Sequence, residues 1–64
     1  MITDKYIIRN IRDDAKIAID SLNSIVAESE NDFVSERYIS EKINRALDCC
    51  SFILSTVEED SDRN

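Results

Sequence analysis

Cys49 and Cys50 are the side chains of this 64-residue chain best suited to chemistry, because a thiolate can bind a metal, form a disulfide or act as a nucleophile. A zinc site needs about four ligands, and the sequence has no histidine and no further cysteine. A disulfide between helical neighbours would be strained. A bridge between two subunits through Cys49 is the alternative, and it requires an oxidising compartment. We interpret both residues as reduced structural thiols.

Carboxylates are the other candidates for chemistry, and they cluster at Asp13-Asp14 and Glu58-Glu59-Asp60. Adjacent residues of a helix diverge, and general acid–base catalysis requires a burial that charged runs seldom have. Without histidine there is no base for a serine or cysteine nucleophile, and without glycine there is no phosphate-binding loop. We expect a protein that is not an enzyme and that binds neither a metal nor a cofactor.

The composition indicates the type of scaffold that positions these groups. The chain is 42% apolar and 34% charged, and it contains neither glycine nor proline. The positive-φ turns of β-hairpins therefore lack their favoured residue, which predicts an all-α fold. No apolar run approaches about 18 residues, and no basic segment precedes an apolar stretch at the N-terminus. We expect a cytoplasmic protein without a membrane span.

Two helix starts are visible in the sequence. Thr3 is a candidate N-cap of a helix over residues 3–28, and Ser35, followed by Glu36, is a candidate N-cap of a second helix over residues 35–58. The short polar link between them makes the two helices antiparallel neighbours. The sequence therefore predicts one helical-hairpin domain over residues 1–58, followed by a polar acidic tail over 59–64 that we expect to fray or remain disordered.

Apolar residues recur at alternating spacings of three and four in both helices, which is the pattern of a packed helical seam. Cys50 falls on this seam as a small apolar residue, with Cys49 on its flank. Ile19, Val26, Leu47 and Leu54 widen the stripes beyond what one hairpin can cover. We therefore expect a homodimer that forms a four-helix bundle. The predicted assembly interface consists of Ile8, Ile11, Ala15, Ala18, Leu22, Ile25, Ile39, Ile43, Ala46, Cys50, Ile53 and Val57.

A basic edge runs along the first helix and consists of Lys5, Arg9, Arg12 and Lys16. Doubled in a dimer, it is a candidate nucleic-acid-binding surface that contacts phosphates. The alternative is a solvated edge whose cations pair with Asp13 and with the acidic tail. The net charge of −6 and the pI near 4.4 favour this second interpretation.

Two helices, a short polar link, an acidic tail and small seam residues such as Ala15, Ala18, Ala46 and Cys50 resemble the layout of the Rop family of plasmid copy-number proteins. That resemblance implies a dimeric four-helix bundle that binds paired RNA loops. The layout is also similar to helical-hairpin co-chaperones of secretion systems and to short acidic inhibitors. Our leading hypothesis is a self-associating protein-interaction module, a regulator, adaptor or inhibitor with a protein partner. An RNA-binding regulator that uses the basic edge is the alternative.

Overall fold

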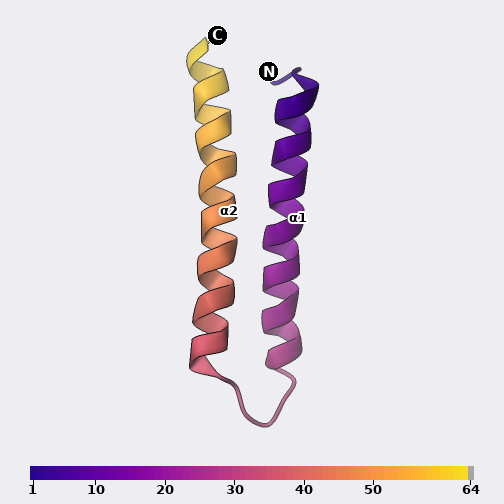
Figure 1. The fold of residues 1–64 in the computed structure, drawn as a ribbon, viewed down its shortest axis with the longest axis vertical. Helices are drawn as coiled ribbons and strands as arrows, with labels where there is room; N and C mark the ends of the chain where they lie inside the picture. The colour runs from indigo at the N-terminus through magenta and orange to yellow at the C-terminus, as the bar shows by residue number, and fades with distance from the viewer. Residues whose placement is uncertain (64) are drawn as a thin grey trace.

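The computed structural model describes the backbone of residues 1–63 and the side chains of residues 1–61. It consists of α1 (Lys5–Glu28) and α2 (Glu36–Arg63), which run antiparallel and are joined by residues 29–35 (Figure 1). No strand occurs in the part of the chain that the structure describes. The predicted all-α helical hairpin is confirmed.

The N-terminus of α1 is capped by Asp4. Its carboxylate accepts hydrogen bonds from the backbone N–H groups of Tyr6, at 2.8 Å, and Ile7, at 3.4 Å. The prediction that Thr3 caps this helix was wrong by one residue. A carboxylate offers the same acceptor as a hydroxyl and adds a negative charge at the positive end of the helix dipole, so Asp4 is the better cap.

The connection between the helices reflects the absence of glycine. The Ser29 hydroxyl donates to the carbonyl of Ile25 at 2.8 Å, and Ser29 itself keeps a right-handed helical conformation. Since no described residue has a positive φ, the chain leaves α1 without the left-handed cap that glycine usually supplies. The connection then needs residues 29–35 to reverse direction. The Glu28 carboxylate accepts from the backbone N–H of Ser35 at 3.3 Å and joins the two ends of the connection.

Ser35 caps α2 as predicted, because its hydroxyl accepts from the backbone N–H of Tyr38 at 3.2 Å. In the next turn, Arg37 forms an exposed ion pair with Glu41 at 3.2 Å. The helix continues to Arg63, beyond the predicted end at Glu58. Residues 59–63 contain no glycine or proline to end the helix. Glu59 and Asp60 line a cleft together with Ile7 and Asn10 of α1, and the last turn of α2 extends beyond the start of α1 (Figure 1). Asn64 lies outside the described residues.

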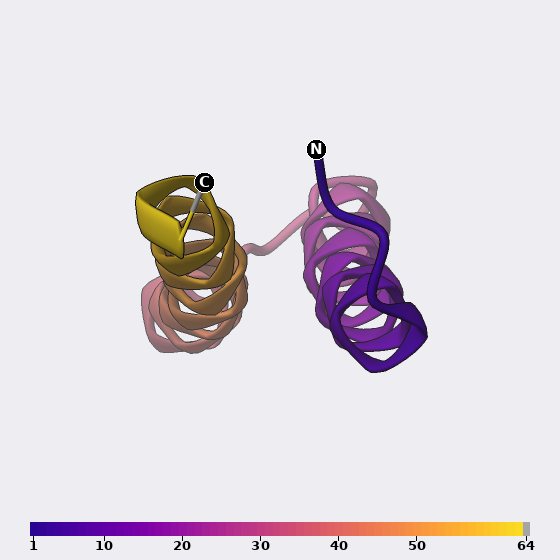
Figure 2. The same cartoon turned by 90° about the horizontal axis from the view of Figure 1, so that it is seen from above.

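The two helices form a single layer, which is evident when the hairpin is viewed from above (Figure 2). Along their contact the buried residues are small: Ala18 and Ser21 from α1, Ala46 and Cys49 from α2. Ile17 packs against this cluster. We call the contact between the helices the seam; its half-buried members are Ile7, Ile11, Ile25, Ile39, Ile53 and Thr56. No large side chain is fully buried among the described residues.

A single layer of two helices has two broad sides, and each helix also has an outer edge opposite the seam. Both broad sides are therefore available for further contacts. Within the described residues, neither helix contains an apolar stretch of the length that a bilayer crossing needs.

Candidate functional site

The predicted interface residues divide into two groups in the structure. Ala18 and Ala46 are buried in the seam, and Ile11, Ala15, Ile25, Ile39 and Ile53 are half-buried. The remaining five are exposed: Ile8, Leu22, Ile43, Cys50 and Val57. Residues that line up along one side of a helix form a column. The predicted interface combined two neighbouring columns of each helix, and only one of these columns faces the other helix.

The two cysteines occupy the reverse of their predicted positions. Cys49 is buried beside Ala18 and Ala46, and it is the small residue that lets the helices approach closely. Cys50 is exposed. The sequence pattern misplaced them because it favours columns of bulky apolar residues, whereas the seam column of this protein includes the polar residues Ser21 and Thr56.

A second apolar surface lies beside the seam. Most of its members follow a seam residue by one position, as Ile19 follows Ala18 and Leu47 follows Ala46. One position along a helix is a rotation of about 100°. Because α1 and α2 are antiparallel, this rotation turns both columns toward the same side of the hairpin. We call this side the open face; it consists of Ile8, Ala15, Ile19, Leu22 and Val26 of α1 and Ile43, Leu47, Cys50, Leu54 and Val57 of α2.

The size of the open face is that of a protein–protein interface. Its eight large aliphatic residues are between 37% and 59% exposed. This corresponds to on the order of 700 Å² of surface, whereas the largest apolar patch of a typical monomer covers roughly 300–600 Å² and each partner of a stable complex buries roughly 800 Å². The open face is thus larger than an isolated soluble protein normally leaves in water.

The opposite broad side is of different character. By helical spacing it consists of residues one position before the seam, and these are mostly charged or polar, such as Asp20, Arg45 and Asp48. Its exposed large apolar members are aromatic: Phe52 is 63% exposed, and the Tyr38 ring lies 5.4 Å from the ammonium of Lys42, whereas the aliphatic Ile17 is half-buried against the seam. Mixed charge and scattered aromatic residues are ordinary for a solvated surface.

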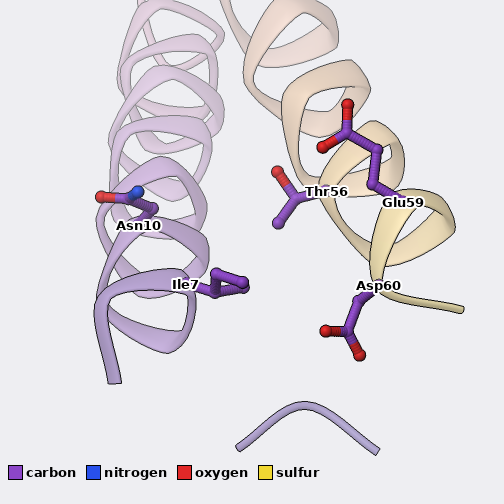
Figure 3. A pocket seen from close by; sticks show the side chains of 5 residues that line it. All are labelled: Ile7, Asn10, Thr56, Glu59 and Asp60. Atoms are coloured by element: carbon purple, nitrogen blue, oxygen red, sulfur yellow. The ribbon is translucent and has the colours of Figure 1, made fainter. Parts of the chain in front are cut away.

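A cleft of about 350 Å³ opens between the helices near the chain termini. Figure 3 shows its lining, with Ile7 and Thr56 pointing toward each other. Asn10, Glu59 and Asp60 complete it. The cleft offers two carboxylates and the hydroxyl of Thr56, which donates to the carbonyl of Phe52 at 2.8 Å. Across the described residues there is no group of three or more histidine, cysteine, aspartate or glutamate side chains that could hold a metal ion.

The four cations of the basic edge are all exposed, and none of them forms an ion pair with another described residue. By helical spacing, Arg9 and Lys16 lie on the side of α1 opposite the seam. Arg12 follows the seam residue Ile11 by one position and borders the open face. The predicted pairing of these cations with Asp13 is not observed.

No family model matches this chain, and no curated protein or solved structure matches it either. Its function is therefore inferred from its own surfaces. Of these, the open face is the one whose area and composition differ most from an ordinary solvated surface.

Proposed function

We propose that the protein is a non-catalytic interaction module that self-associates through the open face and presents its charged outer surface to a protein partner, as a regulator, adaptor or inhibitor. The observation behind this proposal is the distribution of side-chain size. Small residues are buried in the seam, while Leu22, Leu47 and Leu54 remain exposed. Monomeric soluble proteins rarely leave a large contiguous patch of apolar side chains exposed.

Energetics support the same proposal. Chains of this length bury little surface and are only marginally stable, so that a staple, a metal or a partner subunit often adds to their stability. Here the buried positions are alanine, cysteine and serine, each of which contributes little apolar area. Covering the open face would add about 25 cal/mol for each Å² removed from water. Two hairpins stacked on their open faces would form a four-helix bundle, in which each open face covers the other.

The surface left for a protein partner would then be strongly charged. The connection and its flanks contain Glu28, Glu30, Asp32 and Glu36, and the net charge of the chain is −6. An acidic surface of this kind attracts a basic partner surface and speeds its association. Phe33, within the connection, is 88% exposed and could supply an apolar contact beside these carboxylates.

The mass in solution tests self-association. Sedimentation equilibrium at micromolar concentration should give about twice the chain mass of 7.4 kDa. A fully helical protein with the mass of one chain, at every concentration measured, would refute the proposal. Affinity capture from cells with the native chain as bait, and with a chain in which Glu30 and Asp32 are replaced by glutamine and asparagine, would then test the acidic surface. Partners that bind through it should be lost with the second bait.

RNA binding is the second candidate, and the unpaired exposure of the basic edge among the described residues favours it. Affinity for structured RNA should fall steeply between low and moderate salt, because phosphate contacts release counterions. Arg9→Ala and Arg12→Ala should each weaken binding, and Arg45→Ala, which removes a cation from α2, is the matched control. Absence of binding at low salt would exclude this function.

A further inference from the structure

One place on the broad side opposite the open face differs from an ordinary solvated surface. A pocket of about 150 Å³ lies there between the helices, lined by Ile17, Asp20, Ser21 and Ser24 of α1 and by Lys42 and Arg45 of α2. Sites for drug-sized ligands have volumes of roughly 300–1,000 Å³. This pocket therefore has room for one small chemical group.

Ser21 is the most deeply buried residue of the lining, with 3% of its surface exposed. Its hydroxyl forms no hydrogen bond with another described residue, whereas the hydroxyl of Ser24 donates to the carbonyl of Asp20 at 3.0 Å. Among the described residues, no polar side-chain atom is sealed from solvent without a hydrogen-bond partner. The Ser21 hydroxyl therefore keeps some access to solvent, and the pocket that Ser21 lines provides it.

Packing of the helices does not explain a serine at this position. Alanine is of similar size, has the better helix propensity and contains no polar group that burial would penalise. A buried hydroxyl destabilises the fold unless a hydrogen bond compensates for the loss of water. Since the described protein offers no such bond, we infer that the partner of the Ser21 hydroxyl enters the pocket.

The two cations of the lining indicate the charge of this partner. Lys42 is half-buried, and its ammonium lies 5.4 Å from the centre of the Tyr38 ring, a contact that orients the ammonium without neutralising it. Neither Lys42 nor Arg45 forms an ion pair with another described residue. An ammonium, a guanidinium and a hydroxyl all donate hydrogen bonds, and a small oxyanion accepts several of them at once. The lining thus favours an oxyanion.

Asp20 restricts which oxyanion fits. Its carboxylate belongs to the same lining and has no ion-pair partner among the described residues, so the formal charge of the lining is +1. A carboxylate repels a fully ionised anion, but it accepts a hydrogen bond from an anion that retains a proton. Phosphate retains a proton near neutral pH, whereas sulfate does not. A singly charged, protonated phosphate matches both the charge and the acceptor of the pocket.

We propose that this pocket binds a phosphate group that retains a proton. Arg45 and Lys42 donate to its anionic oxygens, the Ser21 hydroxyl donates to a further oxygen, and Asp20 accepts the hydrogen bond from its P–O–H group. The pocket lies on the side away from the open face, so this inference does not depend on self-association.

NMR titrations at about pH 6, where phosphate monoesters retain a proton in roughly half of the molecules, test the pocket. Inorganic phosphate should shift the backbone amide signals of Ser21, Ser24 and Arg45 along a saturable curve, and sulfate at the same ionic strength should not. Phosphoserine distinguishes the sources: tighter binding than inorganic phosphate indicates a phosphorylated molecule as the ligand, and weaker binding indicates the free ion. The absence of a saturable curve with phosphate, or equal curves with phosphate and sulfate, would overturn the proposal.

Two substitutions separate the roles of the lining residues. Arg45→Gln should weaken phosphate binding at least about tenfold, because charge-assisted hydrogen bonds are lost. Arg37→Gln is the matched control, since Arg37 is a cation of the same helix that lies outside the pocket and pairs with Glu41. Asp20→Asn should remove the preference for phosphate over sulfate.

Circular dichroism should show native helicity for all three variants, because the substituted side chains are exposed. Native phosphate affinity of the Arg45→Gln chain, or native selectivity of the Asp20→Asn chain, would contradict the assigned contacts.

Discussion

The seam and the open face are neighbouring columns of the same two helices, yet they contain residues of different size. The seam buries Ala18, Ser21, Ala46 and Cys49, whereas the open face leaves Leu22 and other large aliphatic residues exposed. Small residues allow two helix backbones to approach closely, but they remove little apolar area from water. The comparison indicates a division of roles. The seam sets the geometry of the hairpin, and burial of the open face by a second layer of helices would contribute most of the free energy of assembly.

The largest expected effect is on the stability of the fold, and it comes from a substitution in the seam. Ala18→Glu places a carboxylate where only 6% of the native residue is exposed, without a partner for its charge. An uncompensated buried charge costs about 3–5 kcal/mol, enough to unfold a domain of this size. Circular dichroism should show the loss of most helical signal at 25 °C. Asn23→Glu, on the exposed outer side of α1, is the control and should keep its helicity. Native-like helicity of the Ala18→Glu chain would show that the seam is not the structural core.

A smaller effect, on self-association alone, is expected from a substitution on the open face. Leu54→Glu and Phe52→Glu change residues of similar exposure, 59% and 63%, on opposite broad sides of α2. If the open face is an interface, Leu54→Glu should weaken self-association by at least about tenfold, because the 59% of each leucine that is exposed in the hairpin is worth roughly 1–2 kcal/mol when buried and two leucines are lost per dimer. Phe52→Glu should leave the sedimentation profile unchanged. Equal effects of the two substitutions would remove the distinction between the two sides.

The smallest effect is expected at Ser21, where a substitution separates the size of a seam residue from the polarity of its side chain. Ser21 is 3% exposed, so Ser21→Ala keeps the close approach of the helices while it removes a buried hydroxyl and improves helix propensity. Thermal unfolding should show a gain of about 0.5–1 kcal/mol in the free energy of unfolding, with the mass unchanged. A clear loss of stability would mean that the hydroxyl itself is required in the seam.

The sequence predicted the helical hairpin well and the rotation of its helices poorly. Capping chemistry located both helix starts to within one residue, at Asp4 instead of Thr3 and after Ser35, because caps are local. Which column of each helix faces the other depends on how two segments far apart in the sequence pack together. The polar residues Ser21 and Thr56 lie in the facing column, so the sequence pattern did not identify that column as the seam. The end of α2 was misjudged because acidic composition was interpreted as a break, although no residue there ends a helix.

The open face itself was partly visible in the sequence. Ile19, Val26, Leu47 and Leu54 were predicted to exceed what a hairpin can cover, and all four are exposed. Cys50 and Leu22 belong with them, although the pattern placed both in the seam. Periodicity alone cannot choose between two apolar columns that differ by one position, and only the packing of the small residues decides it.

The central claim, that the open face is covered by a second chain, is tested most directly by the reactivity of the two adjacent cysteines. Cys49 is buried in the hairpin and Cys50 is exposed on the open face. Chains with Cys49→Ala or Cys50→Ala report on one thiol each when they react with a chromogenic disulfide reagent. Cys49 should react slowly at every protein concentration, whereas the rate of Cys50 should fall at least about tenfold as the concentration rises and dimers form. A Cys50 thiol that stays as reactive as in the denatured chain, at all concentrations up to the submillimolar range, would contradict the claim.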